Sequence, residues 1–173
     1  IAGREASVSG SVTGGVFADK NVANDIAVTI SGLSLSGAEA ANYRLSVPGL
    51  KASITPKALT MTGSTVTSRA YDGTRSASVN VGTLSGLVNG ETLGATTAVG
   101  QFADENAGMN KDVAVTYTLV DGVGSVTADA PIFGPGGVLT GGMPVITPGA
   151  KASNYTLAAE TLKGTIAQKA VSV

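Results

Sequence analysis

Apolar and polar residues alternate along much of the chain with a period of two. In residues 113–119, Val, Val, Tyr and Leu occupy every second position, and small or polar residues lie between them. Residues 26–30 repeat this alternation, and shorter versions occur at 59–61, 79–81 and 155–157. A period of two is typical of β-strands with one buried face. The pattern predicts an all-β protein built from antiparallel sheets.

Four blocks of the sequence occur twice, in the same order. The pairs are 17–21 with 102–106, 25–29 with 112–116, 42–45 with 154–157, and 54–61 with 166–173. Ordered repetition is typical of tandem modules that supply length, display or adhesion. We therefore expect a structural role and no enzyme activity.

The spacing between the copies predicts the domain organisation. Phe17 and Phe102 are 85 positions apart, whereas Tyr43 and Tyr155 are 112 apart, so the second copy holds 27 extra residues. We predict that residues 1–56 are the C-terminal part of one β-sandwich module, without a counterpart to about 57–87. Residues 57–168 are predicted to form a complete module with a Gly/Pro-rich insertion at 120–152. Residues 169–173 match the first strand of a further module.

Composition excludes several classes of function. The formal net charge is −1 and the few basic residues do not cluster, so nucleic acid is not an expected partner. No run of about 18 apolar residues occurs, so no membrane insertion is expected. The absence of His and Cys removes the commonest proton shuttle and the usual zinc ligands, and we expect neither a cofactor nor a catalytic residue. The first residues lack the features of a signal peptide, and we expect the chain to begin within a longer protein.

One short motif predicts a tight turn. Tyr71 is followed by Asp72, Gly73 and Thr74, and Asp-Gly readily supplies the positive φ that such a turn needs. The structural interpretation is a hairpin or corner whose tyrosine packs on the core. The functional interpretation makes Asp72 a ligand for a cation or a glycan.

A second motif occurs in both copies. Asn42-Tyr43 and Asn154-Tyr155 each place a tyrosine at the start of a strand, after a turn of small residues. This position is similar to the tyrosine corner of immunoglobulin-like sandwiches, where the phenol hydroxyl holds a neighbouring loop.

Together these motifs resemble a known family. The segments that carry the resemblance are residues 57–63, the Tyr71-Asp72-Gly73-Thr74 turn, residues 84–91, residues 102–104, and Asn154-Tyr155 with Leu157. In this order they resemble the YDG-type repeat domain of large secreted bacterial adhesins, which are similar to filamentous haemagglutinins. The resemblance implies immunoglobulin-like antiparallel β-sandwich modules in tandem, at the bacterial cell surface or secreted. It also implies a stalk, spacer or fibre-forming role in surface display, adhesion, self-association or biofilms.

The insertion is where this chain departs from the repeat. Apolar residues on a long loop favour contact with a partner, and the candidate partner contacts are Ile132, Phe133, Val138 and Leu139. One alternative is a hairpin that pairs residues 137–140 with 143–146 around Gly141-Gly142. A contact with a neighbouring module or chain is another. The alternative function is a carbohydrate- or surface-binding module that uses 120–152, with a host or surface glycan as ligand.

A partial sandwich exposes edges and core, which proteins normally cover. We therefore expect residues 1–56 to be completed by preceding sequence or by strand addition from another copy. A calcium site at Asp19 with Asp25, or at Asp104 with Asp112, stays open. So does a lysine crosslink, for which the candidates are Lys57, Lys111, Lys151, Lys163 and Lys169.

Overall fold

The computed structural model describes residues 7–10, 12, 14–88, 90–127, 132–133, 139–141, 145–147 and 149–172. Contacts divide the chain into two units, unit 1 (Ile1–Thr55) and unit 2 (Pro56–Val173). The expected all-β class is confirmed, because the described helical structure consists of two 3₁₀ turns, η1 (Ala40–Asn42) and η2 (Ala152–Asn154). In the described part of the chain, no helix has the length and apolar character needed to cross a membrane.

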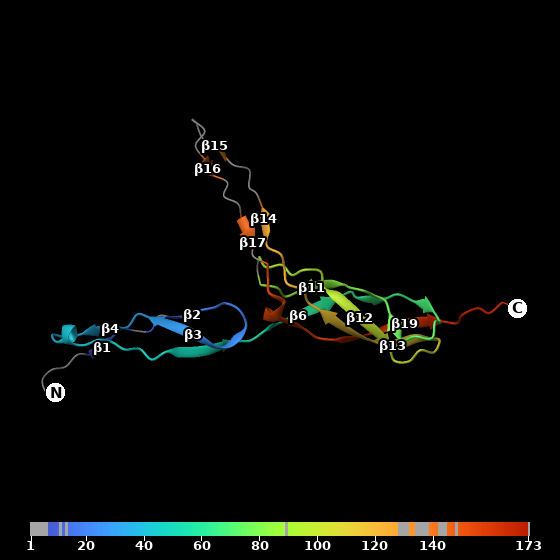
Figure 1. Cartoon of the computed structure of the whole chain (residues 1–173), viewed down its shortest axis with the longest axis horizontal. Helices are drawn as coiled ribbons and strands as arrows, with labels where there is room; N and C mark the ends of the chain where they lie inside the picture. Colours follow the sequence, from blue (N-terminus) through green and yellow to red (C-terminus); the bar gives the residue numbers. More distant parts are fainter. Residues whose placement is uncertain are drawn as a thin grey trace. The chain divides into compact units, whose positions relative to one another are not determined.

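Unit 1 contains two small antiparallel sheets. Its strands are β1 (Ser7–Ser9), β2 (Gly14–Phe17), β3 (Ala23–Ser31), β4 (Ser34–Ser36) and β5 (Leu50–Ile54). β3 lies between β2 and β5, and β1 pairs with β4. Figure 1 shows β2 and β3 side by side, in blue. Among the described residues of unit 1, only Ile26 is buried.

Unit 2 is built around a five-stranded sheet in the order β8-β19-β13-β12-β9. These strands are β8 (Arg69–Ala70), β9 (Ser76–Ala77), β12 (Thr97–Phe102), β13 (Gly108–Thr118) and β19 (Glu160–Ala167). Figure 1 shows β12, β13 and β19 in the body of this unit. β8 joins β19 in the parallel direction, which departs from the purely antiparallel arrangement expected from the sequence.

The five-stranded sheet curves until its two edges approach each other. In a flat sheet of five strands the edges would lie about 19 Å apart, because neighbouring strands are spaced by ~4.8 Å. Yet the Arg69 Nε in edge strand β8 donates to the Ser76 carbonyl oxygen in edge strand β9 at 3.0 Å. The buried face therefore becomes the inside of the curve, where Phe102, Val113, Val115 and Ile166 form one core cluster.

A short hairpin packs against this core. It consists of β7 (Thr65–Val66) and β10 (Val79–Asn80), which pair antiparallel and contribute Val66 and Val79. A Cβ at Gly164 in β19 would lie only 2.8 Å from both the Phe102 ring and Val66. The packing at this point therefore requires glycine.

A second sheet of unit 2 has the order β11-β6-β18. Its strands are β6 (Lys57–Thr62), β11 (Thr83–Ser85) and β18 (Tyr155–Leu157). β6 pairs antiparallel with β11 and parallel with β18. Leu59 in β6 and Tyr155 in β18 are buried in a second core cluster, with Ala150.

The insertion forms a β-ribbon in its described parts. β14 (Ser125–Thr127) pairs with β17 (Val145–Thr147), and β15 (Ile132–Phe133) pairs with β16 (Leu139–Gly141). The predicted pairing of residues 137–140 with 143–146 around Gly141-Gly142 is wrong. β16, which contains Leu139, pairs with β15, and β17, which begins at Val145, pairs with β14. Figure 1 draws β14 and β17 in orange.

The repeated blocks lie on matching strands in the two units. Phe17 ends β2 and pairs with Val28 in β3, while Phe102 ends β12 and pairs with Val113 in β13. Both steps are 85 positions, so Val28 corresponds to Val113. The third strand of each sheet, β5 or β19, lies on the other side of β3 or β13.

The expected match of 25–29 with 112–116 is wrong by two residues. A bulge marks the true register, since Asp25 and Asn110 have left-handed φ values of 55° and 54° at the same point of β3 and β13. A slip of two residues keeps every side chain on its own face of the sheet. Alternation of apolar residues therefore could not detect it.

Candidate functional site

The Tyr71-Asp72-Gly73-Thr74 turn is closed by the Asp72 carboxylate. Asp72 Oδ1 accepts hydrogen bonds from the Thr74 N–H at 2.9 Å and from the Thr74 hydroxyl at 2.8 Å. Gly73 has a φ of 79°, a conformation that L side chains rarely adopt. The Thr74 donors, with the Arg69 guanidinium, hold the pKa of Asp72 below its usual range.

Arg69 organises this turn, although the sequence pattern did not single it out. Its guanidinium pairs with Asp72 and donates to the carbonyl oxygens of Ala70, Thr74 and Ser76. Its Cζ lies 5.4 Å from the centroid of the Phe102 ring, within cation–π range. Arg69 therefore ties the turn, the two sheet edges and the core together. The only sequence signal was an isolated cation three residues before Asp72.

Tyr71 does not pack on the core as expected. Its side chain is 40% exposed, and with Ala107 and Gln168 it lines a shallow surface groove. Its contribution to the fold comes from its backbone, whose N–H donates to the Ala167 carbonyl oxygen at 2.8 Å. The turn is also not a hairpin, because the strands on either side of it pair with β19 and β12 and not with each other.

Tyr155 holds the loop that follows β11. Its hydroxyl accepts a hydrogen bond from the Val88 N–H at 3.2 Å and donates to the Glu91 carboxylate. The side chain is 5% exposed, and burial with the Glu91 contact raises the pKa of Tyr155. Asn154, the other residue of this motif, ends η2.

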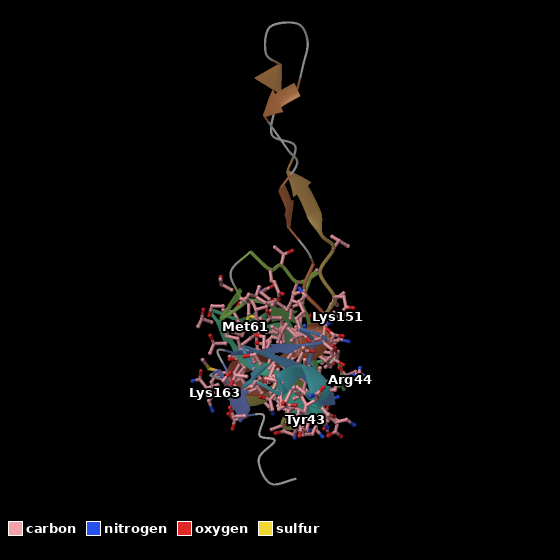
Figure 2. All side chains as sticks on the ribbon, turned by 90° about the vertical axis from the view of Figure 1, so that its left-hand side faces the viewer. Tyr43, Arg44, Met61, Lys151 and Lys163 are labelled. Atoms are coloured by element: carbon pink, nitrogen blue, oxygen red, sulfur yellow. The ribbon has the colours of Figure 1, made fainter. Side chains whose placement is uncertain are left out.

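Tyr43 occupies the matching position in unit 1 and is 45% exposed. It follows η1 as Tyr155 follows η2, and its N–H donates to the Ala40 carbonyl oxygen at 3.1 Å. Asn42 ends η1, and its side chain donates to Glu39. Tyr43 and its neighbour Arg44 are labelled in Figure 2.

The candidate partner contacts of the insertion are only partly placed. Ile132 and Phe133 form β15 and Leu139 begins β16, so the ribbon brings these three positions onto paired strands. Val138 lies outside the described residues. The ribbon begins beside a close backbone crossing, where a Cβ at Gly122 would lie 1.7 Å from the Thr92 carbonyl oxygen.

Two of the recurring aspartates, Asp104 and Asp112, contact lysines. Lys111 pairs with Asp104 and donates to the Asn106 carbonyl oxygen at 2.8 Å, and Lys163 pairs with Asp112. The Lys111 contact and the Asn106 N–H lower the pKa of Asp104. Within the described ranges, no group of three or more Asp, Glu, His or Cys residues is arranged to hold a metal ion.

This arrangement is made of clamps between strands and loops. Arg69 with Ser76 joins the two edges of the curved sheet, Tyr155 with Glu91 fixes a loop, and Tyr117 donates to Glu160 and contacts the Ser64 hydroxyl at 2.7 Å. Each clamp joins segments that are distant in sequence or at opposite edges of a sheet, which makes it suited to holding a fold against distortion.

The comparisons with known proteins identify one family. The family model described as YDG domain matches residues 2–49 and 55–130, which together are well over half of the chain. No curated protein and no solved structure matches the chain.

Proposed function

The chain belongs to the YDG domain family, and on this premise we propose that it is a structural repeat segment of a secreted bacterial surface adhesin. In this role it acts as a stalk, spacer or fibre-forming module for surface display, adhesion and self-association. The proposal includes immunoglobulin-like β-sandwich modules in tandem and a location at the cell surface or outside the cell.

The observation that carries the proposal is the repetition of one strand arrangement. β2-β3-β5 in unit 1 and β12-β13-β19 in unit 2 have the same order and the same bulge. A protein that repeats one framework gains length with each copy, whereas a catalytic pocket needs only one.

The clamps of unit 2 supply what a stalk requires. A module in a stalk bears load between its first and last strands, and here these are β6 and β19. β6 is bound to β18, and β18 leads directly into β19. The Arg69 network holds the other end of β19 through β8. Extension would therefore have to break paired strands at both ends of the module.

The proposal is tested by locating unit 2 on intact cells. An antibody against unit 2 should label unpermeabilised bacteria that produce the full protein, and external protease should remove the label. Removing repeat units from the full protein should also reduce attachment to surfaces. Labelling that appears only after permeabilisation would contradict the proposal.

The alternative is a carbohydrate- or surface-binding module that uses the insertion. One observation favours it: the described strands of the insertion pair only among themselves, so the ribbon is an addition to both sheets. A binding module must be stabilised by its ligand through mass action. A glycan panel that raises the melting temperature of the chain, but not of a variant without residues 125–147, would favour this function.

A further inference from the structure

The first strand of unit 2 is joined to the last strand by a short ladder. β6 lies parallel to β18, in three residue pairs that run from Lys57 with Tyr155 to Leu59 with Leu157. Two residues separate the end of β18 from the start of β19. A pull that reaches β6 from unit 1 can therefore pass through this ladder into β18, and from there along the backbone into β19.

The parallel direction decides how the β6–β18 ladder is loaded. Tension from unit 1 pulls β6 at Lys57, its N-terminal end, whereas tension from beyond β19 pulls β18 at Leu157, its C-terminal end. Because the two strands run in the same direction, these forces slide one strand along the other. All three residue pairs then bear load together, whereas an antiparallel ladder would open one pair at a time.

Side chains reinforce the same ladder. Leu59 and Tyr155 are 4% and 5% exposed, and they are buried in one cluster with Ala150. The Tyr155 hydroxyl accepts from the Val88 N–H and donates to Glu91, so β18 is also fixed to the loop after β11. Sliding β6 along β18 would therefore expose buried apolar surface as well as break backbone hydrogen bonds.

The insertion lies in the part of the chain that this route bypasses, because it leaves and re-enters unit 2 between β13 and β18. Its two legs are held together at the base. The Gly122 N–H donates to the Ala150 carbonyl oxygen at 2.8 Å, and the Ala150 N–H donates to the Thr92 carbonyl oxygen at 2.9 Å. The Gly94 N–H donates to the Val120 carbonyl oxygen at 2.9 Å in the same place. These bonds close the base of the ribbon without involving β6 or β19.

We propose that the β6–β18 ladder carries tension through unit 2 in shear and keeps the insertion ribbon out of the load path. While the ladder holds, tension passes from β6 to β18 to β19, and the chain from β7 to the ribbon bears little of it. Tension on the module would therefore leave the ribbon unchanged until the ladder fails. This inference rests on the proposed function, because a stalk is the role in which the module is pulled from both ends.

Pulling single molecules tests this load path. Handles attached at Thr55→Cys and Ser172→Cys load unit 2 within the full chain, which has no other cysteine. Unit 2 should open in one step of at most about 400 Å, because an extended chain spans ~3.3–3.6 Å per residue. A separate step of about 100 Å at lower force, as expected for the extended insertion alone, would overturn the proposal.

A variant without residues 125–147 identifies the ribbon in the same records. The deletion should shorten the single step by about 80 Å, because it removes chain that is released only after the ladder opens. The opening force should stay the same. A lower opening force in the deletion variant would show that the ribbon itself bears load, and would also overturn the proposal.

Two leucines of one cluster separate mechanical loss from thermodynamic loss. Leu59 lies in the β6–β18 ladder, whereas Leu84 packs against the same cluster from β11, on the other side of β6. Leu59→Ala and Leu84→Ala should both lower the urea midpoint of unit 2. For the same loss of stability, Leu59→Ala should lower the opening force more than Leu84→Ala does. Forces that follow stability alone in both variants would mean that the ladder has no special mechanical role.

The pulling measurements do not depend on where the protein is located in the cell. A chain that labels intact cells but opens through the ribbon first would remove this inference and leave the stalk proposal standing. A chain that opens in one step through the ladder, but is absent from the cell surface, would keep the mechanical assignment and remove the surface proposal.

Discussion

Phe17 and Phe102 occupy the same position in two copies of one strand arrangement, but their environments differ. Each ends the first strand of its three-stranded framework and pairs with a valine of the next. Phe17 is 39% exposed, whereas Phe102 is completely buried. The matching sequences form matching strands in the two units, but these strands alone are not sufficient to make a buried core.

The difference comes from residues 57–87, which have no counterpart in residues 1–56. In unit 2 this stretch supplies β7, β8, β9 and β10, and with them Val66, Ala77 and Val79 against the core. It also supplies Arg69, whose guanidinium lies over the Phe102 ring. The described part of unit 1 thus contains the three-stranded framework without strands that cover its apolar face. Unit 2 contains the same framework together with these covering strands, β7, β8, β9 and β10.

Truncating the two phenylalanines should give the largest difference in stability between the two units. Phe102→Ala should lower the free energy of unfolding of unit 2 by ~3–5 kcal/mol, because it opens a cavity in a closed core. Phe17→Ala should cost about 1 kcal/mol or less, since its ring is already partly in water. Urea unfolding followed by near-ultraviolet circular dichroism measures the first, and hydrogen exchange of residues 14–31 measures the second. Equal losses would mean that unit 1 has a closed core in solution.

Gly164 offers the next largest contrast. Its counterpart 112 positions earlier, in β5, is Ala52. Because a Cβ at Gly164 would press on Phe102 and Val66, Gly164→Ala should destabilise unit 2 by ~1–3 kcal/mol. Gly14→Ala is the control, since no atom lies within 4 Å of the added carbon. A neutral Gly164→Ala in urea unfolding would contradict the packing of the curved sheet.

Much of the framework could be predicted from the sequence, and the cover could not. The alternation at 113–119 predicted the strand that became β13, with Val113 and Val115 facing the core. β8 and β9 have two residues each, and such short strands carry no period. Their place at opposite edges of one sheet depends on Arg69 and Phe102, which are far apart in sequence. The local pattern of apolar and polar residues therefore does not predict that contact.

The motif residues could be named from the sequence, but the contacts of their side chains could be predicted only in part. The Asn-Tyr pattern found Tyr155, which faces a loop as expected of a tyrosine corner. The turn motif drew attention to Tyr71, whereas the contacts centre on Arg69. An arginine that serves as a hub is recognised by what surrounds it in space, and a single sequence does not show this.

Removing the Tyr155 hydroxyl tests the contribution of one clamp. Tyr155→Phe should cost about 1 kcal/mol, because the Val88 N–H and Glu91 lose a partner while the ring stays buried. Tyr71→Phe removes the same group from a side chain that is 40% exposed, and should change stability by a few tenths of a kcal/mol. Urea midpoints of the two variants measure the difference. Similar midpoints would show that the loop is not held by this hydroxyl.

The smallest expected effect is an alkaline loss of stability in unit 2. Burial, with the Glu160 contact for Tyr117 and the Glu91 contact for Tyr155, raises the pKa of both tyrosines above the ordinary value of 10.0. Above that pH the unfolded chain releases these protons while the folded chain keeps them. The free energy of unfolding therefore stays at its full value below pH 10 and falls as the pH rises through the raised pKa values. Urea midpoints between pH 8 and 11 should show this decline, and a Tyr117→Phe/Tyr155→Phe variant, less stable at pH 8, should show a shallower one. An equally steep decline in the double variant would assign the alkaline loss to other groups, and the two tyrosine hydroxyls would then contribute to unit 2 only as neutral hydrogen-bonding groups.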